Sequence, residues 1–187
     1  MALISKHFDL NEFTTIDLSQ EKLYLITALA NNILDPLREF WGCPVTITSS
    51  VRTAADYQRL IDAGYHPSET SDHFYSNSIP IFSPDKIKIW GANYTCGVGA
   101  ADLVPACGAD VAWAKIQPYF NRDNKSIDLP SGSILVGQVI HEFGSGTNWV
   151  HCANPPTLKF SADFVNKFLN RICFLTSADK GISYQAA

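Results

Sequence analysis

Residues Ile134 to Cys152, which read ILVGQVIHEFGSGTNWVHC, predict two β-strands joined by a tight turn. The expected strands run over residues 134–143 and 148–152, because β-branched, apolar and aromatic side chains dominate both stretches. The Gly-Ser-Gly sequence between them, at residues 144–146, is typical of a hairpin turn. The hairpin indicates a fold with antiparallel strands at its centre.

Further strands and helices alternate on either side of this hairpin. Two short strands are expected at residues 45–50 and 99–105, which are rich in β-branched or apolar side chains. Capping residues and apolar spacings of three and four predict helices at residues 19–41, 53–63, 109–120 and 161–174. Pro36 is expected to kink the first helix or to start a new segment. This order predicts an α+β domain with a small, mainly antiparallel sheet flanked by helices.

The chain has 187 residues, of which 46% are hydrophobic, and this is the composition of a folded globular domain. Residues 1–175 are expected to form one domain, and residues 176–187 a frayed C-terminal tail. Residues 65–94 are expected to form a long loop, because they contain many proline, serine and asparagine residues. A loop of this length in a compact domain is usually functional.

Charge and cysteine content exclude several classes of protein. The 14 lysines and arginines and 18 aspartates and glutamates give a net charge of −4, which disfavours nucleic-acid binding. No apolar run approaches the roughly 20 residues that span a bilayer. Residues 1–10 show no secretory signal, so we expect synthesis in the cytoplasm. The five cysteines are widely spaced and odd in number, and we expect most of them to be reduced core residues.

Three residues stand out as a candidate metal-binding set. His73 follows Ser71 and Asp72 in the long loop, Asp102 lies among small residues of an expected core strand, and His151 ends the expected hairpin. A carboxylate in a core strand is costly unless it is paired or binds a metal. Two imidazoles and one carboxylate, with a fourth position for water, form a catalytic zinc set. The alternative is that these are ordinary structural residues, since their spacing alone is a weak signal.

Several short motifs follow one another along the chain. They are His7–Phe13 (HFDLNEF), Leu34–Glu39 followed by Val45–Arg52, Ser71-x-His73, Ala100-x-Asp102 and Trp149-x-His151. In this order they resemble the zinc peptidases that trim peptidoglycan stem peptides. These are the D-Ala-D-Ala carboxypeptidases and L-Ala-D-Glu endopeptidases of the hedgehog-like fold, including many phage endolysins. The resemblance runs from His7 to about Pro155 and implies Zn²⁺ bound by His73, Asp102 and His151.

The chain departs from this family at two places. An apparent insertion at about residues 74–96 separates His73 from Asp102, where the family has a much shorter spacing. Asn148 stands three residues before the last histidine, where the family often has an acidic base. Glu142 lies in an Ile-x-Glu setting that many phage members share, and it is therefore the expected catalytic base. The alternative is that Glu142 is a solvated charge at the end of a strand.

Arg52 and Ser71 match further positions of the family. The resemblance implies that Arg52 acts in catalysis or in substrate binding, on the developing oxyanion or on a substrate carboxylate. The alternative is an ion pair with Asp56 on the surface. Ser71 is expected to bind substrate or to orient His73. His141 should point away from the site, and Trp149 is expected to turn away from His151 into the core.

The resemblance therefore predicts a zinc-dependent peptidase that acts on the peptide of peptidoglycan. Without a signal peptide, such an enzyme would reach the cell wall as a phage endolysin or as part of a virion. The alternative function is a catalytically impaired, zinc-containing protein that binds the wall or builds the virion, and it is motivated by Asn148. A zinc site that only stabilises the fold is a third interpretation.

Overall fold

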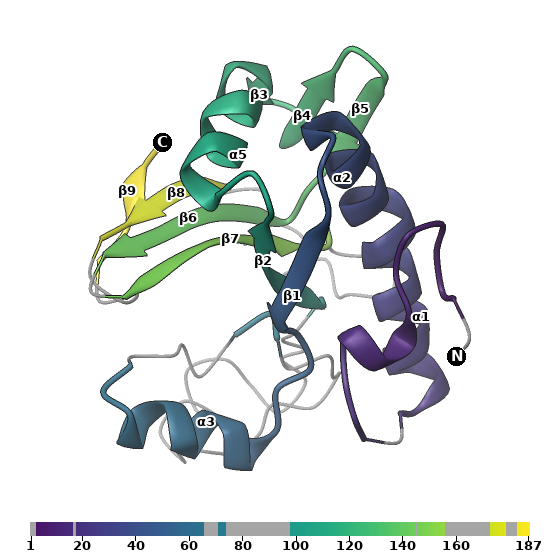
Figure 1. Ribbon diagram of the computed structural model, residues 1–187, viewed down its shortest axis with the longest axis vertical. Helices are drawn as coiled ribbons and strands as arrows, with labels where there is room; N and C mark the ends of the chain where they lie inside the picture. Colours follow the sequence, from purple (N-terminus) through teal and green to yellow (C-terminus); the bar gives the residue numbers. More distant parts are fainter. Residues whose placement is uncertain are drawn as a thin grey trace.

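The computed structural model describes residues 3–16, 18–65, 71–73, 98–144, 146–155, 173–178 and 183–187. In this part of the chain, helices pack against a six-stranded sheet, and a three-stranded antiparallel sheet lies beside helix α5 (Figure 1). The α+β class is therefore confirmed. No helix among these residues is long and apolar enough to cross a membrane.

The larger sheet has the strand order β1-β2-β7-β6-β8-β9. In chain order its strands are β1 (Val45–Ser49), β2 (Ala100–Pro105), β6 (Gln138–Gly144), β7 (Thr147–Ala153), β8 (Phe174–Ser177) and β9 (Gln185–Ala186). Neighbouring strands are antiparallel except for β6 and β8, which are parallel. The mainly antiparallel sheet that the sequence predicted is thus confirmed, although one of its pairs is parallel.

The expected helix at residues 19–41 consists of three segments. They are α1 (Gln20–Leu29), the π-helical turn η2 (Ala30–Leu34) and α2 (Asp35–Trp41). Pro36 lies in the first turn of α2, where its missing N–H needs no partner. The apolar stripe packs into the core, except that Leu23 at its start is 38% exposed. Gly42 ends α2 in the left-handed conformation, with φ of 70°.

Two shorter helices follow. Helix α3 (Ala54–Asp62) begins with a capping box, in which Thr53 and Asp56 each accept the other's backbone N–H. Helix α5 (Ala109–Ile116) ends four residues earlier than the sequence predicted and continues into a 3-10 turn, η3 (Gln117–Tyr119). The reason is Pro118, which cannot donate a backbone hydrogen bond and restricts the residue before it.

The expected strand at residues 134–143 is two strands in different sheets. Strand β5 (Gly132–Leu135) joins β3 (Phe120–Asn121) and β4 (Ser126–Leu129) in the small sheet, while β6 belongs to the large one. The predicted strand is interrupted at Gly137, where the Cβ of any other residue would lie 2.0 Å from the carbonyl oxygen of Asn154. Only glycine allows the backbones to approach so closely.

The C-terminal end also differs from the expectation. Phe174 begins β8, and β9 pairs antiparallel with it through Leu175 with Ala186 and Thr176 with Gln185. Residues 176–177 and 185–186 therefore belong to the sheet, where the sequence predicted a frayed tail. The helix expected at residues 161–174 lies outside the described residues except for its last two positions.

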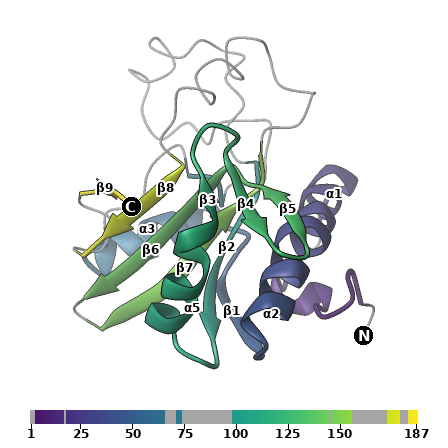
Figure 2. The same cartoon turned by 90° about the horizontal axis from the view of Figure 1, so that it is seen from above.

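The register of the strands shows on which face of the large sheet each candidate site residue lies. Asp102 of β2 lies opposite His151 of β7, and Glu142 of β6 lies opposite Trp149 of β7. Since residues two apart on a strand share a face, all four lie on the same side of the sheet. His141 lies on the other side, which α5 covers (Figures 1 and 2).

Candidate metal centre

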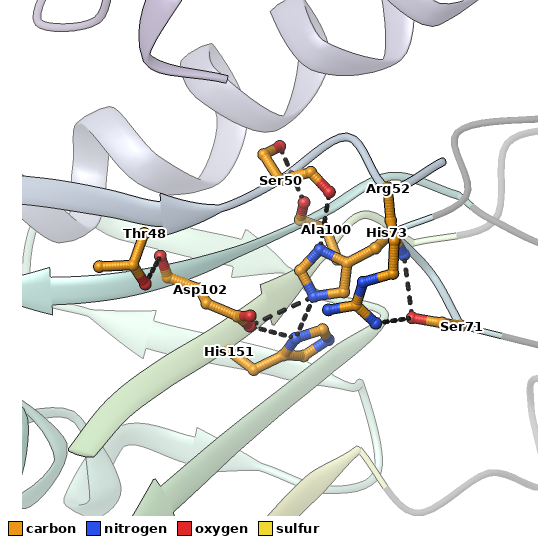
Figure 3. Close-up of polar contacts among 8 residues, drawn as sticks. All are labelled: Thr48, Ser50, Arg52, Ser71, His73, Ala100, Asp102 and His151. Atoms are coloured by element: carbon orange, nitrogen blue, oxygen red, sulfur yellow. Dashed lines mark hydrogen bonds and ion pairs between the residues drawn. The ribbon is translucent and has the colours of Figure 1, made fainter. Parts of the chain in front are cut away.

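Backbone hydrogen bonds hold the short segment that carries His73 at the edge of the sheet. The backbone N–H of Arg52 donates to the carbonyl of His73 over 2.9 Å, and Gly99 donates to the carbonyl of Asp72 over 3.1 Å. Asp72 and His73 are both buried. His73 is thereby fixed between the chain that follows β1 and the chain that precedes β2 (Figure 3).

Three side chains converge at this point. Asp102 Oδ1 lies 2.9 Å from His151 Nδ1 and 3.2 Å from His73 Nε2, and the two imidazole nitrogens are 3.2 Å apart (Figure 3). All three residues are at least 94% buried. The structure therefore brings together the three residues that the sequence predicted as metal ligands.

The hydrogen bonds show which atoms are acceptors. His73 Nδ1 lies 2.8 Å from the carbonyl of Ser50, and a carbonyl can only accept, so Nδ1 carries a proton. In the neutral ring, Nε2 then presents a lone pair to His151 and Asp102. Burial alone would raise the pKa of Asp102, but the two imidazoles hold it well below its usual range, so this carboxyl is ionised. The His73 nitrogen and the Asp102 carboxylate are thus acceptors, and at most the single hydrogen of His151 Nδ1 lies between the three atoms.

A cation fits this arrangement of acceptors. Tetrahedral bonds of about 2.0–2.1 Å, as zinc makes to nitrogen and oxygen, place neighbouring ligand atoms roughly 3.3 Å apart. The three observed separations, from 2.9 to 3.2 Å, are close to this value. Among the described residues, the group that could hold a metal ion consists of His73, Asp102 and His151. The Ser50 carbonyl would orient His73 toward the metal, as groups behind metal-binding histidines commonly do.

Arg52 and Ser71 lie beside this group. A guanidinium nitrogen of Arg52 donates to Ser71 Oγ over 3.2 Å (Figure 3). Burial lowers the pKa of Arg52, while the charges of Asp102 and Glu142 oppose this shift. Asp56, the alternative partner of Arg52, caps α3 and lies 3.7 Å from Arg59. Arg52 is therefore hydrogen-bonded to Ser71 and feels the negative charges of Asp102 and Glu142, and more weakly that of Asp56.

Glu142 shares the electrostatic environment of this group. Burial raises the pKa of Glu142 to about 7, with a further contribution from the negative charge of Asp102, while His151 and Arg52 act in the opposite direction. The side chain is partly buried and lies on the same face of the sheet as Asp102 and His151. A carboxyl with a pKa near 7 can both accept and donate a proton at neutral pH.

Asn148 and His141 form a separate cluster on the other face. The Oδ1 atom of Asn148 lies 3.1 Å from His141 Nε2, and its Nδ2 atom donates to Asp110 over 2.8 Å. His141 is also 3.2 Å from Asp110 and stacks on Trp113. The expectation that His141 points away from the site is correct, and Asn148 points away with it.

The prediction that Trp149 turns away from His151 into the core is wrong. It lies two residues before His151 on β7, so the two share a face, and Trp149 is half-buried rather than in the core. Its indole Nε1 and the Nε2 of His151 are buried without a hydrogen-bond partner among the described residues. Sequence reasoning also missed Ser50, although its place two residues before Arg52 put it beside the site.

Comparisons of the chain with models of known protein families, with curated proteins and with solved structures gave no match. The class of site is therefore defined by its geometry, as a buried centre of two histidines and one aspartate that could hold a metal ion. The apparent insertion at residues 74–96 lies outside the described residues.

Proposed function

We propose that the protein is a zinc-dependent peptidase that hydrolyses amide bonds in peptidoglycan stem peptides. It would act as a D-Ala-D-Ala carboxypeptidase or as an L-Ala-D-Glu endopeptidase on the hedgehog-like fold. The observation that carries this proposal is the convergence of His73, Asp102 and His151 on one face of the sheet, with Glu142 on the same face. The ordered motifs from His7 to His151 supply the substrate class, since their arrangement resembles the wall peptidases.

The donor set favours zinc in a catalytic rather than a structural role. Structural zinc sites usually have four protein ligands and are rich in cysteine, whereas catalytic sites keep one position open. The group here contains two histidines and one aspartate. When bound, Zn²⁺ supplies a Lewis acid that polarises a carbonyl group and favours the ionisation of water.

Glu142 would act as the proton carrier of the reaction. Its pKa is about 7 in the metal-free protein, and a cation bound nearby would lower this pKa and favour the carboxylate at neutral pH. In this form Glu142 takes a proton from the attacking water and then passes it to the nitrogen of the departing amine. General acid and base catalysis of this kind contributes about 10²–10⁴ to a rate.

Arg52 would bind the negative charge of the substrate. Its guanidinium is partly buried and hydrogen-bonded to Ser71, so its orientation is restrained before a substrate arrives. A restrained guanidinium is well suited to a developing oxyanion or to the carboxylate of a stem peptide. Ser71 would position Arg52, and its hydroxyl also accepts from the backbone N–H of His73 over 3.4 Å.

Mass spectrometry of peptidoglycan fragments tests this proposal. The fragments are incubated with zinc-loaded protein, with metal-free protein and with zinc restored after removal. Zinc-dependent loss of one alanine would define a carboxypeptidase, and cleavage between the first two stem residues an endopeptidase. Activity that persists after complete removal of the metal contradicts the proposal.

A zinc-loaded protein that binds wall fragments and produces no new species would favour the alternative function. That alternative is a zinc-containing wall-binding or virion structural protein. This alternative was based on Asn148 in place of an acidic base. That basis is weakened, because Asn148 lies on the face of the sheet opposite His151 and hydrogen-bonds His141 and Asp110.

A further inference from the structure

Two cysteines lie side by side at the end of strands β1 and β2, away from the metal centre. Cys43 follows Gly42, where α2 ends, and Cys107 lies in the turn before α5. The strands pair through Val45 with Pro105, and Ala106 extends this pairing by donating to the carbonyl of Pro44 over 2.8 Å. The same register, continued by one residue on each strand, sets Cys43 opposite Cys107.

The position of Cys43 and Cys107 at the end of the β1–β2 ladder favours a disulfide bond between them. Since Pro44 and Ala106 share a hydrogen bond, the next pair along the ladder, Cys43 and Cys107, occupies a non-hydrogen-bonded position. Side chains at such positions approach most closely across antiparallel strands. The sulfur atoms are 3.1 Å apart, with the thiol of Cys43 donating to the sulfur of Cys107. A small movement of the two side chains brings them to bonding distance.

Both cysteines of this pair lie partly at the surface. Cys43 and Cys107 are partly exposed, whereas Cys152 and Cys173 are buried. This partly exposed pair therefore differs from the core cysteines that the sequence predicted, and among the described cysteines it is the pair that combines contact with partial exposure. Access matters because thiol–disulfide exchange proceeds through direct attack on a sulfur atom.

We propose that Cys43 and Cys107 form a disulfide bond by exchange with a small-molecule disulfide such as glutathione disulfide. The thiolate of one cysteine attacks a sulfur of glutathione disulfide, forms a mixed disulfide and releases one glutathione thiol. The thiolate of the other cysteine attacks the protein sulfur of the mixed disulfide, closes the bond and releases the second glutathione thiol. Two protein thiols are oxidised and one glutathione disulfide is reduced, and the two thiol hydrogens end on the two glutathione molecules.

The bond would restrain the part of the chain that carries most of the site. The closed segment, residues 43–107, contains Arg52, His73 and Asp102. A disulfide that closes a long loop stabilises a fold mainly by restricting the unfolded chain. Asp102 lies three residues, roughly 10 Å, before Pro105 at the end of β2, and Cys107 lies two residues further on, so we expect the bond to leave the metal ligands in place. The inference does not depend on the proposed peptidase activity.

Thiol counting on the wild-type protein tests the inference. The protein is equilibrated with mixtures of reduced and oxidised glutathione, quenched with acid, denatured and alkylated, and then weighed by mass spectrometry. We expect the number of alkylated cysteines to fall from five to three as the mixture becomes more oxidising. A peptide map should link Cys43 to Cys107. Five alkylated cysteines in the most oxidising mixture, or a link between any other pair, overturns the inference.

Variants and thermal unfolding give a second measurement. Cys43→Ser and Cys107→Ser should each stop at a mixed disulfide with glutathione, because the remaining cysteine has lost its partner. The wild type should melt several degrees higher when oxidised than when reduced, and the double variant should melt at one temperature in both mixtures. The zinc content of the wild type should be equal in both mixtures, which separates this test from that of the metal centre. A double variant that keeps the redox-dependent melting shift contradicts the inference.

Discussion

Two buried histidines lie on neighbouring strands and face opposite sides of the same sheet. His141 on β6 and His151 on β7 are each 6% exposed, and each lies within 3.2 Å of an aspartate. Around His141, the amide of Asn148 donates to Asp110 while its oxygen faces the imidazole. Around His151, the neighbours are the ionised Asp102 and a nitrogen of His73.

The two clusters differ in the burial of the aspartate and in the hydrogen bonds of the imidazole. The side chain of Asp110 is 68% exposed, whereas that of Asp102 is 9% exposed. In the His141 cluster the amide of Asn148 supplies both a donor and an acceptor, so its polar groups complete one another. In the His151 cluster, His73 Nδ1 donates to the Ser50 carbonyl, so at most the hydrogen of His151 Nδ1 lies between the three converging atoms. The Nε2 atom of His151 is buried without a partner among the described residues. A buried carboxylate needs a compensating positive charge, which a metal ion or a protonated imidazole can supply. The buried carboxylate of Asp102 therefore makes this cluster the candidate cation site, whereas Asp110 is open to solvent and needs no such partner.

The same substitution at Asp102 and at Asp110 should give the largest difference in zinc content and activity. Asp102→Asn removes the charge that a cation needs, and we expect loss of bound zinc and a fall in peptidase activity of more than about 100-fold, which exceeds typical effects of residues behind the ligands. Asp110→Asn makes the same chemical change on the other face and should keep one zinc per chain. Elemental analysis and the peptidoglycan assay measure both. Equal zinc content in the two variants would contradict the assignment of the metal site to Asp102 rather than to Asp110.

Glu142→Gln should produce the next largest effect and should separate catalysis from metal binding. The amide cannot accept a proton, so we expect activity to fall by about 10²–10⁴, while zinc content stays at the wild-type value. His141→Gln, on the preceding residue and the opposite face, is the matched control and should keep most of its activity. A Glu142→Gln protein with wild-type turnover would assign the base to another residue.

The pH dependence of stability should reveal Glu142 in the metal-free protein. Its pKa in the folded state, about 7, lies above the ordinary value of 4.5, so folding favours the protonated form. This contribution is present below about pH 4.5 and is lost as the pH rises through about 7. Between pH 5 and pH 8 the wild type should lose about 2–3 kcal/mol relative to Glu142→Gln in the free energy of unfolding, measured with urea. Parallel pH profiles for the two proteins would contradict the assigned burial of Glu142.

The smallest predicted effect is that of His141→Phe, which is compared with His151→Phe. His141→Phe keeps an aromatic ring against Trp113 and loses two polar contacts, which should cost about 1 kcal/mol in the free energy of unfolding. Zinc content should not change. His151→Phe should abolish zinc binding, because it removes a ligand atom. Urea unfolding and elemental analysis distinguish the two outcomes, and zinc loss from His141→Phe would show that the two faces are coupled.

Local patterns were sufficient for most elements and for the candidate ligands. The helix cap at Thr53, the stop at Gly42, and strands β1 and β2 follow from side chains that are close in sequence. His73, Asp102 and His151 could be proposed from their residue types and from the motifs around them. These predictions succeeded because capping, chain reversal and strand preference act over a few residues.

Two of the errors arose where a distant segment decides the local structure, whereas the error at Trp149 was a local one. The break between β5 and β6 depends on the carbonyl of Asn154, which lies 17 positions beyond Gly137 in the sequence. The strand structure of residues 185–186 depends on pairing with β8. Trp149 shares a face with His151, and strand periodicity alone could have shown this.

The sequence by itself determined the helices, the strands that carry Asp102 and His151, and the kinds of side chain available to bind a cation. Only the tertiary structure decided that these side chains meet. The register of β2 against β7 sets Asp102 opposite His151, and the backbone of residues 50–52 turns His73 toward them. The physical reason is that pairing between strands 49 positions apart depends on the packing of the whole sheet, whereas each strand is specified by its own residues.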